Sequence, residues 1–269
     1  MITSRSLSLA TVLVAIGSVA FAQQKPAPPP RPGAVRTTAK PDPKNVPVQR
    51  LHLEVDGIYH AATLTLSDRA TPTVYAETGQ LTADYDVPAG AGFSGGATYR
   101  LWRNLGVGAS ISMFSTSFPA AVTGSIPYPF QFNRPRTFEG SVSGLERKEM
   151  AIGIHLRGLF QLSPKFTISA FAGPARLTVT QDVVTAIQYS EAYPYDTATF
   201  SAAAIGTDKV NKWGVTAGAD VAYYFTRNVG IGVGAKFNGG EAELISLGTT
   251  PLSSKLGGAE FGGGLRFRF

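Results

Sequence analysis

Three histidines and two nearby carboxylates are the residues of this chain best suited to chemistry. His52, Glu54, Asp56 and His60 lie in one short segment, and His155 follows far downstream. Imidazole and carboxylate groups are suitable ligands for transition metals, and a histidine beside a nucleophile can act as a general base. However, the chain has no HExxH motif, no tight His-x-His pair and no cysteine. We therefore expect no metal site, no catalytic residue and no cofactor.

The segments that carry these residues alternate between apolar and polar side chains with a period of two, which is the pattern of β-strands. The end of the chain shows it clearly. One face there consists of Ala259, Phe261, Gly263, Leu265, Phe267 and Phe269. The other face consists of Glu260, Gly262, Gly264, Arg266 and Arg268. The same alternation occurs at 50–59, 150–161, 212–225 and 229–238.

Short polar links and longer polar segments separate the predicted strands. The short links are Arg103-Asn104, Ser163-Pro164-Lys165 and Thr226-Arg227-Asn228, as hairpins require. The longer segments, predicted as loops, lie near 67–82, 118–146, 184–208 and 246–254. The strands are predicted at roughly 49–66, 83–102, 105–118, 147–162, 165–183, 209–226, 229–245 and 255–269. Short turns at one end and long loops at the other predict an all-β, eight-stranded antiparallel up-and-down transmembrane β-barrel.

One predicted strand departs from simple alternation. In residues 165–183 the apolar positions change from even to odd at Gly173-Pro174. Proline cannot pair in a regular central ladder, so this sequence predicts a β-bulge.

Alternation alone does not say which face points inward. The polar face is dominated by glycine with occasional charges, and the apolar face carries the bulky residues. An eight-stranded lumen has room for side chains but not for a water channel. Rows of bulky apolar side chains would cause aggregation in water, whereas in lipid they are favourable. This comparison favours a membrane barrel over the alternative, a periplasmic lipocalin-like binder with an apolar cavity.

By the same parity, many charged residues point into the lumen. They are His52, Glu54, Asp56, Arg100, His155, Arg157, Asp220, Lys236, Glu260, Arg266 and Arg268. A buried charge without a partner costs several kcal/mol, so we expect a lumenal charge network that plugs the barrel. Lys236 has an acid on each neighbouring strand, Asp220 and Glu260.

The chain divides into three segments. Residues 1–22 have the features of a secretory signal peptide, with Ala20-Phe21-Ala22 as the cleavage site. Residues 23–48 form a proline-rich basic tail, expected in the periplasm as a solvated spacer or as a contact for an anionic partner such as cell wall or lipid phosphates. Residues 49–269 form the barrel. Since residues 51–269 carry as many basic as acidic side chains, we expect no nucleic-acid partner.

The last strand also carries a resemblance. A final Phe269, preceded by Phe267, Leu265 and Phe261 at alternating positions, resembles the C-terminal signal that the outer-membrane assembly machinery recognises. Residues 49–269 resemble the small-barrel superfamily typified by the outer membrane protein A transmembrane domain. More narrowly, they resemble "outer membrane beta-barrel domain" proteins, whose roles are mostly unassigned. The resemblance implies an outer-membrane location, with membrane lipid and the barrel assembly machinery as partners.

The leading functional hypothesis is a non-enzymatic barrel without an open pore. It would support the envelope or bind partners at the surface through its loops, among them Phe132-Asn133-Arg134-Pro135-Arg136 and Tyr193-Pro194-Tyr195-Asp196. The alternative is an outer-membrane enzyme that modifies lipid A by acyl transfer or deacylation, as some small barrels do. A third hypothesis, passage of small hydrophobic ligands through a lateral opening, needs a gap in the wall or kinked strands.

Overall fold

The computed structural model describes residues 49–248 and 250–269. The predicted signal peptide (1–22) and the predicted basic tail (23–48) lie outside the described residues. Within the described part, the regular secondary structure consists of β-strands alone, as the alternating pattern predicts. In this part no helix is long and apolar enough to cross a membrane.

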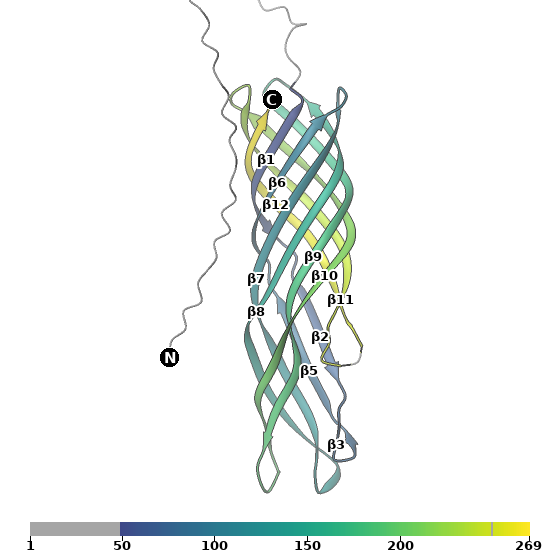
Figure 1. Ribbon diagram of the computed structural model, residues 1–269. Coiled ribbons are helices and arrows are strands. Elements are labelled where there is room, and N and C mark those ends of the chain that lie inside the picture. Colours follow the sequence, from purple (N-terminus) through teal and green to yellow (C-terminus); the bar gives the residue numbers. More distant parts are fainter. Residues whose placement is uncertain (1–48, 249) are drawn as a thin grey trace, which may run out of the picture. The chain divides into compact units, whose positions relative to one another are not determined.

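The strands build one closed wall and one small separate hairpin (Figure 1). In chain order they are β1 (Leu51–His60), β2 (Leu64–Ala70), β3 (Thr73–Val74), β4 (Glu77–Thr78), β5 (Gln80–Val87), β6 (Gly90–Arg100), β7 (Leu105–Tyr128), β8 (Gln131–Gln161), β9 (Phe166–Glu191), β10 (Ala198–Tyr224), β11 (Val229–Leu244) and β12 (Leu252–Arg268). Eight of them form an antiparallel ring in the order β1-β6-β7-β8-β9-β10-β11-β12, which the pairing of β12 with β1 closes. β2 continues β1, β5 precedes β6, and β3 pairs with β4. The predicted eight-stranded antiparallel barrel is confirmed.

The segments predicted as long loops are mostly strand. β7 and β8 continue through most of 118–146, and β9 and β10 continue through most of 184–208. β8 alone has 31 residues, whereas about 9–11 residues allow a tilted strand to cross a bilayer. The loop prediction is wrong at 118–146 and 184–208, because polar side chains on the outer face of a strand give the same composition as a polar loop. At 246–254 it is largely confirmed, since β11 ends at Leu244 and β12 begins at Leu252.

The outward face of the barrel changes character partway along the strands. In the half nearest the short turns, bulky apolar side chains point outward and are not covered by protein. On β7, Val107, Ile111 and Met113 are exposed over 39%, 37% and 50% of their surface. Further along the same face come Ser115 and Ser117. We call the outward apolar residues the apolar band: Val55, Tyr59, Phe93, Tyr99, Val107, Ile111, Met113, Ile152, Ile154, Leu156, Phe166, Ile168, Trp213, Val215, Val221, Tyr223, Ile231, Val233, Phe237, Phe261 and Leu265.

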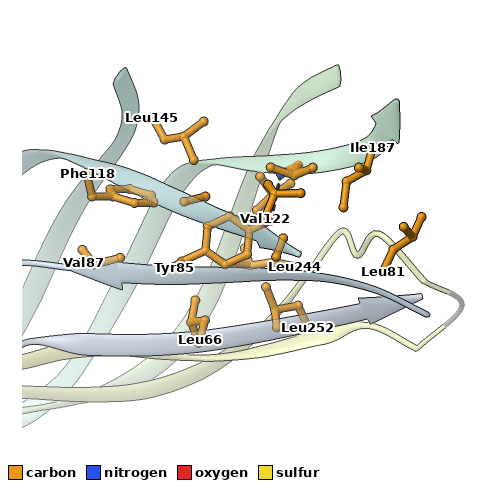
Figure 2. Packing of buried hydrophobic residues seen from close by; sticks show 14 of the residues in the cluster. Leu66, Leu81, Tyr85, Val87, Phe118, Val122, Leu145, Ile187, Leu244 and Leu252 are labelled. Carbon is orange, nitrogen blue, oxygen red and sulfur yellow. Dashed lines mark hydrogen bonds between the residues drawn. The ribbon is translucent and has the colours of Figure 1, made fainter. Parts of the chain in front are cut away.

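In the other half of the barrel the apolar side chains point inward. We call this half, formed by residues 64–87, 115–149, 176–212 and 239–256, the extension. Figure 2 shows Tyr85 of β5, Phe118 and Val122 of β7, and Leu252 of β12 directed into its interior. Apolar residues inside and polar residues outside are the arrangement of a water-soluble protein. The same strands therefore suit lipid at one end and water at the other.

The phase change at Gly173-Pro174 marks this transition. β9 pairs with β10 without a register shift at this point, and Gly173 lies opposite Thr216. Before the change, apolar residues such as Ile168 point outward, and after it residues such as Leu177 are buried inside. The predicted bulge is therefore wrong, because the register on both sides of β9 is kept, although Gly173 and Pro174 do not pair with β8. What changes here is the environment of the two faces of the strand.

The β11–β12 hairpin leaves the barrel wall in the extension. Its pairing with β10 stops where Val215 lies opposite Gly239. Its pairing with β1 stops where His60 lies opposite Glu260. Beyond these points β11 and β12 pair only with each other in the described part of the chain, so residues 239–258 form a two-stranded flap.

Side chains of neighbouring strands hold the far end of this flap. Asp68 of β2 accepts hydrogen bonds from Ser246 Oγ and Leu247 N, both at 2.6 Å. Asp208 of β10 accepts one from the backbone nitrogen of Ile245 at 2.9 Å. The buried apolar residues of the flap are Ala242, Leu244, Leu252 and Leu256. The flap thus covers part of the apolar interior of the extension.

Candidate functional sites in the lumen and at the tip

Ion pairs cross the lumen of the half that carries the apolar band. Arg157 of β8 donates two hydrogen bonds to Glu54 of β1, at 2.6 and 2.8 Å. Arg266 of β12 binds Asp56 at 2.6 Å through Nη1 and Asp220 at 3.0 Å through Nε. Charge-assisted pairs of this kind are among the stronger hydrogen bonds in proteins. These five side chains, which we call the lumenal ion-pair network, connect four strands of the ring.

Glu260 is the centre of a second polar group. Its Oε2 lies 3.0 Å from Lys236 Nζ, and its Oε1 accepts a hydrogen bond from Asn238 at 2.7 Å. Of the two acids predicted beside Lys236, the structure brings Glu260 into contact. Asp220 instead binds Arg266, because the register places Gly218 opposite Lys236.

The three histidines are buried and lie apart. The ring of His155 lies 4.6 Å from that of Phe171, and the ring of His60 stacks on Phe114 at 4.5 Å. His52 lies near the short turns, opposite Arg268 in the ladder. Among the described residues, no group of three or more His, Asp or Glu side chains could hold a metal ion.

Two arginines lie at the short-turn end of the lumen. Arg268 donates hydrogen bonds to the carbonyls of Arg227 and Pro164, each at 2.8 Å. Its guanidinium carbon lies 3.7 Å from the centre of the Tyr224 ring. Arg100 is half-buried on β6. Each of the eleven residues predicted to point into the lumen is thus buried or half-buried in the structure.

Little empty space is left between these side chains. A cavity bordered by Glu54, Arg157, Lys236 and Arg266 has a volume of about 40 Å³. A buried water needs roughly 10–15 Å³ by this measure. The cavity therefore has room for about three waters.

Sequence reasoning missed a buried arginine in the extension. Arg147 is only 1% exposed, and it donates hydrogen bonds to Glu149 at 2.6 Å, Ser254 Oγ at 3.1 Å and the carbonyl of Lys255 at 2.9 Å. It also binds Gln181. Arg147 thereby ties β8 and β9 to the flap. The signal was available, because Arg147 has the same inward parity as the later lumenal residues of β8.

Exposed aromatic side chains gather at the far end of the extension. Phe130, Phe132 and Tyr193 are exposed over 69%, 70% and 84% of their surface. The ring of Tyr195 lies 5.7 Å from Phe130 and 6.2 Å from Tyr193, and Tyr128 lies 5.8 Å from Phe130. We call these five residues the aromatic tip. The structure thus brings together the two sequence segments predicted as candidate binding loops.

A buried arginine supports the aromatic tip from below. Arg136 donates hydrogen bonds to the carbonyls of Pro127 at 2.6 Å and Tyr195 at 2.9 Å. It also forms an ion pair with Glu191. Glu191 in turn accepts a hydrogen bond at 2.7 Å from Tyr75, which lies in the β3–β4 hairpin. Three separate chain segments are therefore fixed to one charged pair.

The residues that resemble an assembly signal lie on the outward face of β12. Phe261, Leu265 and Phe269 are exposed over 53%, 47% and 56% of their surface. Phe267 is half-buried. All four belong to the half of the barrel that carries apolar side chains outside.

The structure combines a closed ring of strands, an outward apolar band and a charged lumen. Only a closed barrel or a helix satisfies every backbone hydrogen bond in lipid, and apolar-out, polar-in alternation is the pattern of membrane barrels. This chain is an outer-membrane-type β-barrel. The short turns of such barrels lie on the periplasmic side, so we expect the extension, at the opposite end, to project outside the cell.

Similar solved structures are also outer-membrane proteins. OprG from Pseudomonas aeruginosa has a TM-score of 0.45 and 10% identity, covering 82% of this chain and 96% of that one. Neisserial surface protein A has a TM-score of 0.40 and 13% identity, covering 81% and 97%. The outer membrane protease OmpT from Escherichia coli has a TM-score of 0.45 and 10% identity, covering 82% and 97%. No protein-family model and no curated protein matches the chain.

Proposed function

We propose that this protein is a non-enzymatic barrel of the outer membrane that binds partners outside the cell through its aromatic tip. The proposal rests on one observation: along a single strand, the outward side chains change from apolar in the apolar band to polar in the extension. From Met113, in the apolar band, β7 continues to Tyr128 at the tip. At about 3.3 Å per residue and a tilt of about 40°, this lifts the tip on the order of 40 Å above the outer edge of the band.

The composition and support of the tip favour binding. Phenylalanine, tyrosine and arginine are enriched in protein interfaces. The tip is joined to a closely packed interior by Arg136 and Glu191, so little conformational freedom is lost when a partner binds. An exposed aromatic group on a rigid support is a stronger candidate for recognition than one on a flexible loop.

The lumen supports the absence of a pore, because the lumenal ion-pair network leaves only small cavities. The positions of the histidines argue against the lipid A enzyme. His52, His60 and His155 are buried inside the barrel, whereas acyl transfer needs a base beside a nucleophile where lipid can reach it.

The remaining partners are also part of the proposal. Membrane lipid would contact the apolar band. The barrel assembly machinery would recognise the outward side chains of β12, which are Phe261, Leu265, Phe267 and Phe269. The basic tail would act as a spacer, with anionic cell wall or lipid phosphates as the alternative contact.

Binding at the tip can be tested with intact cells. Cells that carry the natural chain should be retained on at least one surface in a panel of immobilised glycans and matrix proteins. The Phe130→Ser/Phe132→Ser/Tyr193→Ser variant should lose this retention by about tenfold, a loss of about 1.4 kcal/mol. The Ser117→Ala/Thr123→Ala variant, changed on the outer face of β7, is the matched control and should bind normally.

Two results would contradict the proposal. One is equal retention of all three strains on every surface, with heat-modifiable gel mobility showing that each barrel is folded. The other is a change in lipid A acylation when the gene is deleted, which would support the enzyme instead.

A further inference from the structure

The barrel wall has a window where the flap leaves β1 and β2. β1 and β12 pair as far as His60 and Glu260, and the nitrogen of Ala61 still donates to the carbonyl of Ala259 at 2.9 Å. Beyond this point no ladder joins β2 to β12 in the described residues. Contact resumes where Asp68 binds the far end of the flap. The window is therefore bounded above and below by hydrogen bonds.

A cavity of about 400 Å³ lies behind the window. Its apolar lining comes from Leu64, Val87, Phe114 and Leu256. Phe237 also belongs to the lining, is 53% exposed, and is the last member of the apolar band on β11. The cavity thus borders the outer edge of the lipid-facing surface, where the acyl chains of membrane lipids can reach it. It is ten times larger than the lumenal cavity of about 40 Å³.

One side of the cavity is polar, and its buried charges are paired, while the charged residues Glu241 and Lys255 at the same cavity are exposed and lie opposite each other in the ladder. Arg147 is paired with Glu149 at 2.6 Å, and Glu149 also accepts a hydrogen bond from Gly257 N at 2.8 Å. His60 lines the cavity and is 3% exposed; its Nδ1 lies 3.9 Å from Glu260 Oε1 and has no hydrogen-bond partner within the part of the chain that the structure describes. Buried polar atoms in native proteins nearly always have a partner. An uncharged hydrogen-bonding group in the cavity would supply one.

The backbone at the base of the flap requires glycine. Gly257 and Gly258 have φ values of +74° and +147°, which side-chain-bearing residues rarely adopt. A Cβ on Gly258 would lie 2.4 Å from the Cβ of Ala62. The two glycines let β12 turn away from β1 while passing close to it.

We propose that this cavity binds one linear hydrocarbon chain that carries an uncharged hydrogen-bonding group, such as an alcohol or an ester. The apolar part lies against Leu64, Val87 and Leu256, and the polar group bonds to His60. The volume falls in the range of about 300–1,000 Å³ that is usual for small-molecule sites. This site lies on the wall of the barrel, and it does not depend on the proposed binding function of the aromatic tip.

Photo-crosslinking of the full chain in phospholipid nanodiscs tests the proposal. The first probe is dodecanol with a diazirine in its chain, and the second is a phosphatidylethanolamine with a diazirine in one acyl chain. We expect crosslinks in residues 60–64 and 255–258. Labelling by the alcohol identifies a free amphiphile, and labelling by the phospholipid alone identifies a chain of the bilayer. Either result supports the site.

Variants of two residues that line the cavity test the site directly. Ala62→Trp should fill the cavity and lower labelling by about tenfold, or about 1.4 kcal/mol. Ala121→Trp, exposed on the outer face of β7, is the matched control and should label normally. His60→Phe should weaken labelling by the alcohol but not by a dodecane probe, which gives a second test if Ala62→Trp does not fold.

Two outcomes would overturn the proposal. One is labelling confined to outward residues such as Phe237 and Phe261. The other is unchanged labelling in both the Ala62→Trp and His60→Phe variants. The tip variant proposed above should label normally, so a failure of the tip hypothesis is distinguishable from a failure here.

Discussion

Met113 and Ser117 project from the same outward face of β7, but Met113 suits a lipid environment and Ser117 an aqueous one. Met113 is 50% exposed and belongs to the apolar band, while Ser117 is exposed on the extension. Over the same stretch of β7 the inward face changes in the opposite sense, from Ser112 to Phe114 and Phe118. From Met113 to Ser117 the pairing of β7 with β8 keeps its register, and the register shift comes only between Phe118 and Ala120. The side chains therefore change in type before the backbone changes in geometry.

Breaking the ion pair between Arg157 and Glu54 should destabilise the barrel strongly. The Arg157→Met variant leaves a carboxylate that is only 14% exposed without its partner, which costs about 3–5 kcal/mol. The Glu54→Gln/Arg157→Met variant should recover part of this loss. The urea dependence of tryptophan fluorescence in vesicles measures both.

The control for this experiment is an exposed ion pair. Lys148 and Glu146 lie 2.6 Å apart, but their side chains are 60% and 50% exposed. Lys148→Met should leave the free energy of unfolding nearly unchanged, because water screens an exposed ion pair. An equally small effect of Arg157→Met would contradict a lumen held together by the ion-pair network.

A cavity in the extension should loosen that half of the barrel alone. Leu145 is fully buried, and Leu145→Ala should cost about 2–5 kcal/mol. Hydrogen exchange should become faster at 118–128 and 179–187 and stay unchanged at 153–160. Ser141→Ala, on the exposed face of β8, is the control. Faster exchange throughout the barrel would show that the extension is not a separate packing unit.

High pH should destabilise the extension through Tyr85. Burial raises the pKa of Tyr85 to about 12, and its hydroxyl oxygen accepts a hydrogen bond from Val184 N at 2.9 Å. In the unfolded chain the pKa is about 10, so the unfolded state loses its proton first. The stabilisation is complete below about pH 10 and falls by about 1.4 kcal/mol per pH unit up to about pH 12.

The comparison of the natural chain with Tyr85→Phe isolates this effect. Hydrogen exchange of β5 and β9 between pH 10 and 12 should accelerate more steeply in the natural chain. Equal pH dependence of the two proteins would show that Tyr85 ionises as easily in the folded as in the unfolded state.

The ring and its inward face could be predicted because each depends on local alternation alone. Asp56 and Arg266 have inward parity in any register, and the structure places them in contact. The partner of Asp220 could not be predicted, because it depends on the register between β10 and β11.

The extension could not be predicted from the sequence, because its apolar side chains point inward instead of outward. Outward serines on β7 resemble a loop in composition, and the phase change at Gly173-Pro174 resembles a break in a strand. The window has a different cause, since it depends on where the ladder ends at His60 and Glu260. The alternation of apolar and polar residues continues past the end of a ladder, so the sequence does not show where the pairing stops.

Site-directed labelling on one strand tests the central claim most directly, since the chain has no cysteine of its own. Ile111→Cys and Ser117→Cys lie on the same outward face of β7, on either side of the proposed boundary. In intact cells, a polyethylene-glycol maleimide too large to cross the outer membrane should label Ser117→Cys and leave Ile111→Cys unmodified until the barrel is denatured. Protection of both positions, or labelling of both, would contradict a barrel that is lipid-facing below this point and water-facing above it.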